Sequence, residues 1–229
     1  MQYPIRINHY LALQQYCSRR QADKLIAAGK VRVNGQRAVI GQQIKQGDTV
    51  SLDERIVKKI SESRVYLAYH KPLGTDTHAI KIKNFPDLFP VGRLDKNSHG
   101  LILLTNDGRI TDRLLNPKYS HEKVYFVTVD KKLRPGFLEH LRQGVRIDDF
   151  TTRPATVSKI SEHQFKITLT EGRHHQIRRM CDGFSYTVRS LKRTRIMNLE
   201  LGRIPPGQNR KIAGRELELF LKLLGLESR

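Results

Sequence analysis

An aspartate between two cations precedes a hydrophobic segment near the middle of the chain. Asp95 lies between Arg93 and Lys96, and the polar segment 97–100 leads into the apolar run LILLT. Loops that feed a strand often present reactive groups, and a carboxylate there can act as a nucleophile or a general base. The simpler interpretation of so short a motif is an aspartate that hydrogen-bonds its own turn.

The charge of the chain favours nucleic acid as its partner. The 229 residues include 42 Lys or Arg and 22 Asp or Glu, which gives a net charge of +20, and the excess is spread along the whole chain. A charge that serves only solubility, or a membrane surface, is a weaker explanation. Seven cations and one acid, Asp182, fall between residues 173 and 195, and we interpret most of these cations as contacts to an RNA backbone. They are Arg173, Arg178, Arg179, Arg189, Lys192, Arg193 and Arg195.

Residues 1–60 predict a small RNA-binding domain. Ser18 and Gln21 form a capping box for a helix, and Asn34-Gly35 is a strong hairpin signal. A turn at Gly47-Asp48 precedes a further strand, so two short helices and a small sheet are expected. The segment resembles the RNA-binding domain of ribosomal small-subunit protein S-four over about residues 5–52. Three cations at the start of the helix, Arg19, Arg20 and Lys24, are predicted to contact phosphates.

The polar segment 53–64 predicts a linker, and residues 61–229 predict an α+β domain with a mixed or antiparallel sheet. Helices are expected near residues 134–144 and 174–183, and a terminal helix packs through Leu217, Phe220, Leu221 and Leu224. Strands are expected at VYLAYH, GLILLT, KVYFVTV, PATVSKI and FKITLT.

The longer motif GRLDKNSHGLILLTNDG closely resembles the signature of RNA pseudouridine synthases, in the branch typified by ribosomal small-subunit synthase A. That branch also carries an N-terminal S-four-like domain. HKPLG at 70–74, HEKVYFVTV at 121–129 and LTEGRHHQIRRMCDGFSYTVRSLKRTRI at 169–196 fit the same branch. The last stretch is most similar to the F-type large-subunit rRNA synthases, although the long basic C-terminal extension of some of them is not part of this sequence.

The resemblance implies roles for four residues. Asp95 is the catalytic aspartate, Tyr125 stacks on the target base, Arg178 is the ion partner of Asp95, and Leu191 matches an apolar pocket residue. His99 stands where the family usually has Gln or Thr, and GTDTHAI after Gly74 is shorter and more polar than the family pattern, so both are expected to affect the pocket rim.

Further basic residues are candidates for substrate binding. Lys71 is expected to approach a substrate phosphate or the catalytic loop, unless HKPLG is only a structural turn. We also expect substrate contacts from Arg93, Arg173, Arg179 and Arg193.

No metal or cofactor is expected. His174 and His175 are neighbours whose side chains should point in different directions, with no acidic or cysteine partners at ligand spacing. Isomerisation of uridine involves no net redox change and no added group, so it requires no cofactor. Cys17 and Cys181 are far apart and are expected to be buried, reduced thiols.

Together these observations predict an rRNA pseudouridine synthase of the large subunit that flips a uridine out of the RNA. The carboxylate either bonds covalently to the substrate or removes a ribose proton to give a glycal, and the sequence leaves both routes open. Two rival functions are a non-catalytic RNA-binding or ribosome-assembly factor and a metal-dependent RNA hydrolase. Without a signal peptide or membrane-spanning run, a cytoplasmic monomer is expected. An assembling ribosomal particle or a tRNA remains open as substrate.

Overall fold

A computed structural model describes residues 3–14, 16–53, 55–56, 64–148 and 150–226. The chain divides into two compact units. One comprises Met1–Val65 with Thr105–Thr111, and the other comprises Tyr66–Leu104 with Asp112–Arg229. The predicted boundary at residue 60 and most of the predicted linker lie outside the described residues.

The first unit contains the predicted helix and hairpin. Ser18 caps α2 (Arg19–Ala27) through the expected capping box, in which the Gln21 backbone N–H donates to Ser18 Oγ and the Ser18 N–H donates to Gln21 Oε1. The hairpin turns at Asn34 (φ 51°) and Gly35 (φ 80°), a conformation that these residue types tolerate. The remaining elements of this unit are β1 (Ile5–Arg6), α1 (Ile7–Leu13), β2 (Val31–Val33), β3 (Gln36–Arg37), β4 (Gln43–Ile44) and β5 (Val50–Leu52).

The predicted single small sheet of this unit is wrong, because the strands form two sheets. β3, β2 and β5 form one sheet, whereas β4 pairs with β1 and places Ile44 opposite Ile5. Both isoleucines are buried in the core of the unit, so burial of these side chains favours the separate pair.

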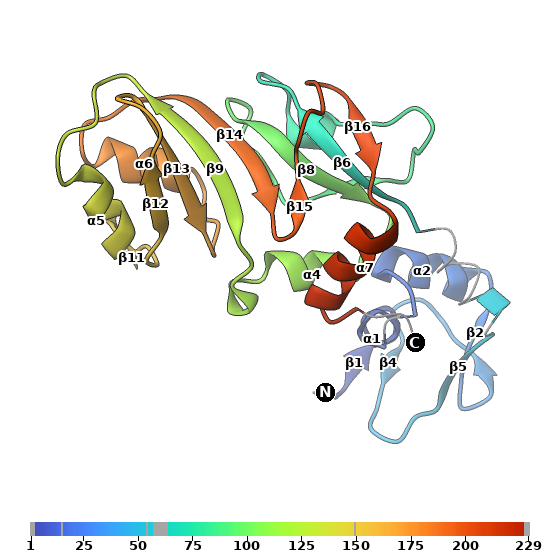
Figure 1. The fold of residues 1–229 in the computed structure, drawn as a ribbon. Coiled ribbons are helices and arrows are strands. Elements are labelled where there is room, and N and C mark those ends of the chain that lie inside the picture. Colours follow the sequence, from blue (N-terminus) through green and yellow to red (C-terminus); the bar gives the residue numbers. More distant parts are fainter. Residues whose placement is uncertain (1–2, 15, 54, 57–63, 149, 227–229) are drawn as a thin grey trace. The chain divides into compact units, whose positions relative to one another are not determined.

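The second unit is built on one mixed sheet, and its α+β class is confirmed (Figure 1). The strand order is β12-β13-β9-β14-β8-β6-β16, with β15 beside β14 and β7 beside β8. β14 runs parallel to β8 and antiparallel to β9. The strands are β6 (Tyr66–Lys71), β7 (Phe89–Val91), β8 (His99–Thr105), β9 (Lys123–Val129), β12 (Thr156–Lys159), β13 (Gln164–Leu169), β14 (Val188–Ile196), β15 (Leu199–Glu200) and β16 (Asn209–Lys211).

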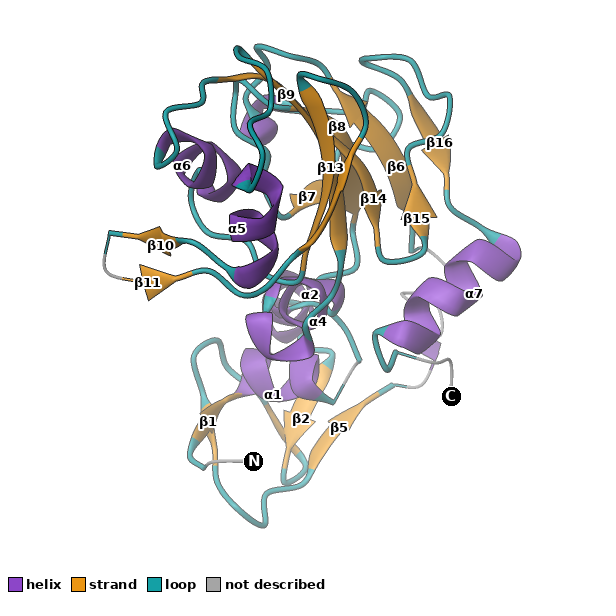
Figure 2. Ribbon diagram, turned by 60° about the vertical axis from the view of Figure 1, so that its left-hand side comes forward, coloured by secondary structure: helices purple, strands orange, loops and turns teal. Residues whose placement is uncertain are grey.

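The helices and short elements complete the second unit. α5 (Phe137–Gln143) and α6 (Gln176–Asp182) lie on one face of the sheet (Figure 2). Their side chains Phe137, Leu141 and Met180 share a core with Val127 and Phe165 of the sheet. The other elements are η1 (Thr77–Ala79), η2 (Pro117–Tyr119), a second small sheet of β10 (Arg146–Ile147) and β11 (Phe150–Thr151), and α7 (Gly214–Leu223). The helix α4 (Ile110–Leu115) begins in the segment assigned to the first unit and ends in the second.

All five predicted strands and all three predicted helices of this unit are present, with shifted ends. The sequence did not predict β14, which is the strand between β9 and β8. On α7 the predicted packing face is confirmed, since Phe220 and Leu224 are buried. No helix among the described residues is long and apolar enough to cross a membrane.

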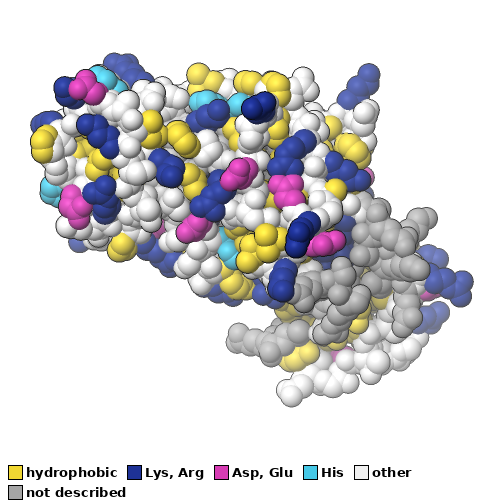
Figure 3. Space-filling model, viewed as in Figure 1, with side chains coloured by type: hydrophobic (Ala, Val, Ile, Leu, Met, Phe, Trp, Pro, Cys, Tyr) yellow, Lys and Arg dark blue, Asp and Glu magenta, His cyan; other side chains and the backbone are white. Residues whose placement is uncertain are grey.

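The basic residues do not gather in one place on the face shown in Figure 3. Lys and Arg side chains are scattered over the second unit there, with Asp and Glu between them. A polyanion would therefore meet positive charge over a broad area of this face.

Candidate active site

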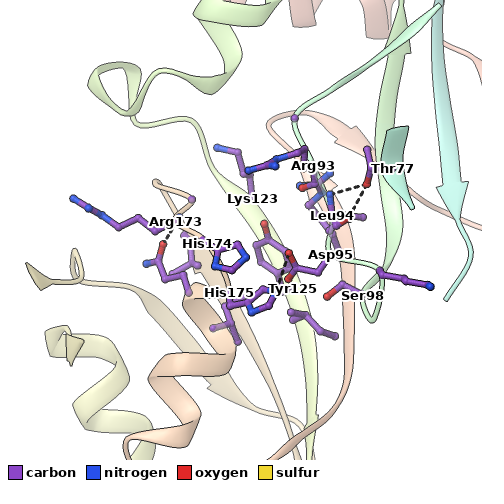
Figure 4. A pocket seen from close by; sticks show the side chains of 18 of the residues that line it. Thr77, Arg93, Leu94, Asp95, Ser98, Lys123, Tyr125, Arg173, His174 and His175 are labelled. Carbon is purple, nitrogen blue, oxygen red and sulfur yellow. Dashed lines mark hydrogen bonds and ion pairs between the residues drawn. The ribbon is translucent and has the colours of Figure 1, made fainter. Parts of the chain in front are cut away.

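A pocket of about 420 Å³ opens beside the middle of the sheet in the second unit (Figure 4). This volume lies in the range of about 300–1,000 Å³ that is typical of small-molecule sites. Asp95, Tyr125 and Leu191 all line it, so the structure brings these three predicted residues together. The cations that also line it are Arg93, Lys96, Lys123, Arg173 and Arg193.

The loop that carries Asp95 is fixed through its backbone on both sides of the carboxylate. The hydroxyl of the buried Thr77 donates to the Leu94 carbonyl at 2.6 Å and accepts from the Leu94 N–H at 3.1 Å. Ser98 closes the turn by donating its N–H to the Asp95 carbonyl at 2.9 Å. The Asp95 side chain itself remains 31% exposed. The carboxylate is therefore oriented by its neighbours and accessible from the pocket.

Lys71 binds backbone carbonyls near the Asp95 loop and is too deeply buried to contact a phosphate of the substrate. Its side chain is fully buried, and its ammonium donates to the carbonyls of Thr75 at 2.6 Å, Pro72 at 3.1 Å and Lys96 at 3.4 Å. The Gly74 N–H donates to the same Lys96 carbonyl at 2.8 Å. Burial lowers the pKa of Lys71. Of the two predicted roles, contact with the catalytic loop is the one that this geometry allows.

Arg178 contacts the Asp95 loop differently from the prediction. Its guanidinium donates to the carbonyls of Asn97 at 2.6 Å and Val188 at 3.1 Å, and to Ser98 Oγ at 3.3 Å. Within the described residues it forms no ion pair with Asp95. The loop turns its backbone carbonyls toward α6, so the guanidinium binds these oxygens and leaves the carboxylate to the pocket.

Among the described residues, the side chain at ion-pair distance from the Asp95 carboxylate is that of His175. Its Nε2 lies 3.5 Å from Asp95 Oδ1. His175 has φ 52° and precedes α6, and its ring stacks on His174 with centroids 3.9 Å apart. The prediction that the two histidines point in different directions is wrong, because the left-handed backbone at His175 brings the rings together.

Tyr125 and Leu191 form the apolar wall of the pocket. Tyr125 lies on β9 opposite Arg193 of β14, and Leu191 lies opposite Val127 on the same pair of strands. Tyr125 is 8% exposed and belongs to the core. A base that entered the pocket would meet the tyrosine ring and the leucine side chain on the same face of the sheet.

The four arginines predicted to bind substrate have different environments. Arg93 and Arg173 line the pocket, and the Arg173 guanidinium lies 4.1 Å from the centroid of the Phe150 ring. Arg179 does not line it, and forms an ion pair with Asp148 and a contact with Phe150. Arg193 also lines the pocket, but it is 4% exposed and donates to the carbonyl of Leu101, so its predicted contact with substrate stays a prediction.

The three basic residues predicted for RNA contact in the first unit are exposed on α2. They are Arg19, Arg20 and Lys24. Arg20 and Lys24 are four residues apart and therefore lie on the same side of the helix.

The departures from the family pattern lie in two different places. His99 is not among the residues that line the pocket, and its Nε2 lies 3.2 Å from Ser190 Oγ while its ring stacks on His70. Its expected effect on the pocket rim is therefore wrong. Residues Asp76, Thr77 and His78 of the GTDTHAI segment do line the pocket.

Sequence reasoning assigned no role in this pocket to Lys123 and did not connect His175 with Asp95. Lys123 stands two residues before Tyr125, and this alternation along a strand was the available signal that both side chains face the pocket. Thr77 lies in the GTDTHAI segment that was expected to affect the rim, but no signal in the sequence indicated its hydrogen bonds to Leu94. Among the described residues, no three His, Cys, Asp or Glu side chains gather at metal-binding distance. Cys17 and Cys181 are buried free thiols, as expected, and burial raises their pKa values to about 11 and about 12.

Family models match two separate parts of the chain. The model of RNA pseudouridylate synthases matches residues 65–182, and the S4 domain model matches residues 5–50. The chain belongs to the RNA pseudouridine synthase family. The synthase is thus an isomerase with an N-terminal RNA-binding domain, as its motifs indicated.

Relatives of the synthase match it along nearly its whole length. The dual-specificity RNA pseudouridine synthase RluF of Escherichia coli is 41% identical over 230 residues, which cover 96% of this chain and 79% of the relative. The ribosomal small subunit pseudouridine synthase A of Pseudomonas aeruginosa is 35% identical over 228 residues, with 93% and 99% covered. A crystal structure of a pseudouridylate synthase has a TM-score of 0.68 at 24% identity, covers 96% of this chain and 99% of its own, and supports the fold.

Proposed function

We propose that this synthase isomerises one or a few uridines in ribosomal RNA of the large subunit, with Asp95 as its essential carboxylate. The observation that carries the proposal is the accessible carboxylate of Asp95, held on a fixed loop over a pocket with Tyr125 and Leu191 in its wall. The name of the Pseudomonas relative refers to the small subunit, whereas the motif around Arg178 is most similar to large-subunit synthases.

The pocket fits a base that has left the RNA stack. Extruding a nucleotide costs a few kcal/mol, which stacking on an aromatic ring and phosphate contacts offset. Tyr125 provides the ring, and Arg93 and Arg173 at the pocket provide positive charge. In this arrangement the ribose of the flipped uridine faces Asp95.

His175 is proposed as a positioning residue for the Asp95 carboxylate. We expect His175→Asn to lower the single-turnover rate about tenfold without changing the RNA dissociation constant, because the contact of the imidazole Nε2 with the Asp95 carboxylate is lost. Asparagine also tolerates the left-handed backbone of this position. The control is His163→Asn, an exposed histidine away from the pocket. A rate equal to that of the unmodified chain would refute the role of His175.

The first unit is proposed to hold the RNA through phosphates. Replacing Arg19, Arg20 and Lys24 together by alanine should lower the slope of log affinity against log salt by about 2, since each lost phosphate contact removes about 0.7–0.9. Filter-binding titrations over a salt series measure this slope. The matched control replaces three exposed lysines of the second unit: Lys159, Lys166 and Lys211. An equal slope for the α2 variant and the unmodified chain would show that the RNA docks elsewhere.

The proposed substrate is tested by mapping pseudouridine in total RNA from cells that lack the protein, with carbodiimide-dependent reverse-transcription stops. Complementation uses the intact chain or Asp95→Asn. We expect one or a few stops in large-subunit rRNA that only the intact chain restores.

Because the Escherichia coli relative is named dual-specificity, the tRNA fraction is mapped in parallel. If no stop is lost in the deleted cells, a ribosome-assembly factor in the cytoplasm becomes the better assignment. Cleavage of the RNA that EDTA abolishes would instead support the metal-dependent RNA hydrolase.

A further inference from the structure

Lys123 presents a partly buried ammonium group to the pocket. It lies on the same face of β9 as Tyr125, two residues earlier, and both line the pocket. In Figure 4 the side chains of Lys123 and Arg93 lie above the Tyr125 ring, and His175 lies below it. The Lys123 ammonium has one hydrogen-bond acceptor among the described residues, the His121 carbonyl at 3.2 Å. An ammonium can donate three hydrogen bonds, so Lys123 retains donors for a ligand.

A second buried cation, Arg193, lies close enough to Lys123 to affect its pKa, and its acceptors among the described residues are backbone carbonyls. Arg193 donates from Nε to the Leu101 carbonyl at 2.8 Å and from Nη1 to the Arg93 carbonyl at 3.4 Å. Its Nη2 is buried without an acceptor in the described part of the chain. Burial, with a smaller contribution from Arg193, lowers the pKa of Lys123 to about 8. This end of the pocket is therefore positive and stabilises an electronegative ligand.

Breakage of the glycosidic bond generates negative charge on the base, whether the carboxylate attacks the sugar or removes a ribose proton. The bond between N1 of uracil and C1′ of ribose breaks, and its electron pair remains on the base. The deficit at the sugar is met by a bond from the carboxylate oxygen to C1′, or by loss of the C2′ proton to that carboxylate. In both cases the charge of the departing uracil spreads from N1 to O2 and O4. Preorganised donors at such developing charge are among the strongest contributors to catalysis.

We propose that Lys123 is a catalytic residue whose ammonium donates a hydrogen bond to a carbonyl oxygen of the flipped uracil and stabilises the uracil anion during breakage of the N1–C1′ bond. This inference rests on the proposed roles of Asp95 and Tyr125. Lys123 keeps its proton throughout. The base then turns and C5 bonds to C1′, while the carboxylate–C1′ bond breaks in one route and the carboxylate returns its proton to C2′ in the other. The C5 proton leaves to solvent and N1 gains a proton from solvent, so the product has the same atoms as the substrate and Asp95 is regenerated.

The test compares single-turnover rates at saturating RNA for Lys123→Met, Lys123→Arg and the unmodified chain. Methionine keeps the unbranched shape and most of the length of the side chain and removes the charge. We expect Lys123→Met to lower the rate about 10²–10³-fold, the loss typical of a missing donor to a developing anion, and to change the dissociation constant less than threefold. The matched control is Lys166→Met on the neighbouring strand β13, which removes the same charge from an exposed side chain. Unchanged unfolding temperatures show that the variants fold.

RNA with 5-fluorouridine at the target position identifies the step when breakage of the N1–C1′ bond is measured as loss of the parent nucleoside, because C5 of this base carries fluorine in place of the proton that leaves last. Fluorine withdraws electrons and makes uracil a better leaving base, so the defect of Lys123→Met should shrink on this substrate. In addition, kcat/KM of the unmodified chain should fall above pH about 8 as the free Lys123 loses its proton, and Lys123→Arg should lack this decrease because arginine stays charged.

Three results would overturn the proposal: a rate for Lys123→Met within threefold of the unmodified chain, a loss of affinity alone, or an equal defect on the fluorinated RNA. A loss of affinity alone would assign Lys123 to a phosphate of the substrate. The activity of Asp95→Asn shows whether only the role of Lys123 is wrong or the proposed function as a whole is wrong. An inactive Asp95→Asn beside an active Lys123→Met refutes only the role of Lys123.

Discussion

Asp95→Asn should abolish pseudouridine formation while leaving the fold and RNA affinity nearly unchanged. The substitution keeps the shape of the side chain and removes its charge and basicity, so both the covalent and the glycal route stop. We expect a decrease in single-turnover rate of at least about 10³-fold, in line with the removal of a nucleophile or general base. The loop should keep its conformation because Thr77, Lys71 and Arg178 hold its backbone.

The measurement pairs carbodiimide mapping on a purified RNA fragment with an RNA titration and a thermal melt. Asp76→Asn is a matched control, since Asp76 also lines the pocket while its carboxylate accepts from the backbone N–H of His78. The side-chain oxygen of asparagine can accept the same hydrogen bond from the His78 N–H, so this variant should keep most of its activity. Turnover of Asp95→Asn close to that of the unmodified chain would remove Asp95 from the mechanism.

The position of Asp95 could be predicted from sequence, but its immediate partner could not. The motif from Gly92 to Gly108 predicted that this loop carries the reactive carboxylate, and the structure places Asp95 at the pocket. The contacts of Arg178 depend on which atoms the loop turns toward α6, and this is decided by tertiary contacts such as that of Thr77. His175 reaches Asp95 only because its φ is positive, and nothing in HHQ predicts this.

The central strand β14 shows why a basic segment is difficult to assign. Its sequence VRSLKRTRI has cations at four of nine positions, and register shifts at 188–190 and 193–195 break the alternation of apolar residues. Such a segment does not look like a strand in the sequence. It becomes one because it pairs with β9 and β8, and the sequence does not reveal this pairing. The burial of Arg193 could not be predicted for the same reason. Arg193 lies on β14 opposite Gly100 of β8, and its guanidinium donates to the Leu101 carbonyl of that strand.

Lys123 also links function to stability. Because its pKa is about 8 in the folded protein and 10.5 when exposed, the unfolded chain binds more protons between these values. The protonated group therefore destabilises the fold fully below pH about 8, and this effect disappears as the pH rises toward 10.5. Allowing for partial solvent screening, it amounts to about 2 kcal/mol at neutral pH. Lys123→Met should be more stable than the unmodified chain at pH 7 while being less active, which is the behaviour of a group kept for function.

Gly100→Ala should strongly destabilise the second unit, although it adds only one methyl group. Gly100 has φ 110°, and a Cβ at this position would lie 2.2 Å from the Arg193 carbonyl oxygen and 2.8 Å from its nitrogen. Both neighbours are backbone atoms of β14, which pairs with β8 at this residue, so the strands must separate. The strained φ and the lost pairing together should lower the free energy of unfolding by about 3 kcal/mol or more.

Urea unfolding at neutral pH measures this difference, and Gly172→Ala is the matched control. Gly172 lines the pocket, has no positive φ, and a Cβ there would meet nothing within 4 Å. It should therefore unfold at nearly the same urea concentration as the unmodified chain. Gly100→Ala should also lose isomerase activity, because separation of β8 from β14 moves Arg193 and Leu191 away from the loop that holds Asp95. If Gly100→Ala were as stable as Gly172→Ala, the close pairing of β8 with β14 would be wrong, and with it the geometry of the pocket that depends on it.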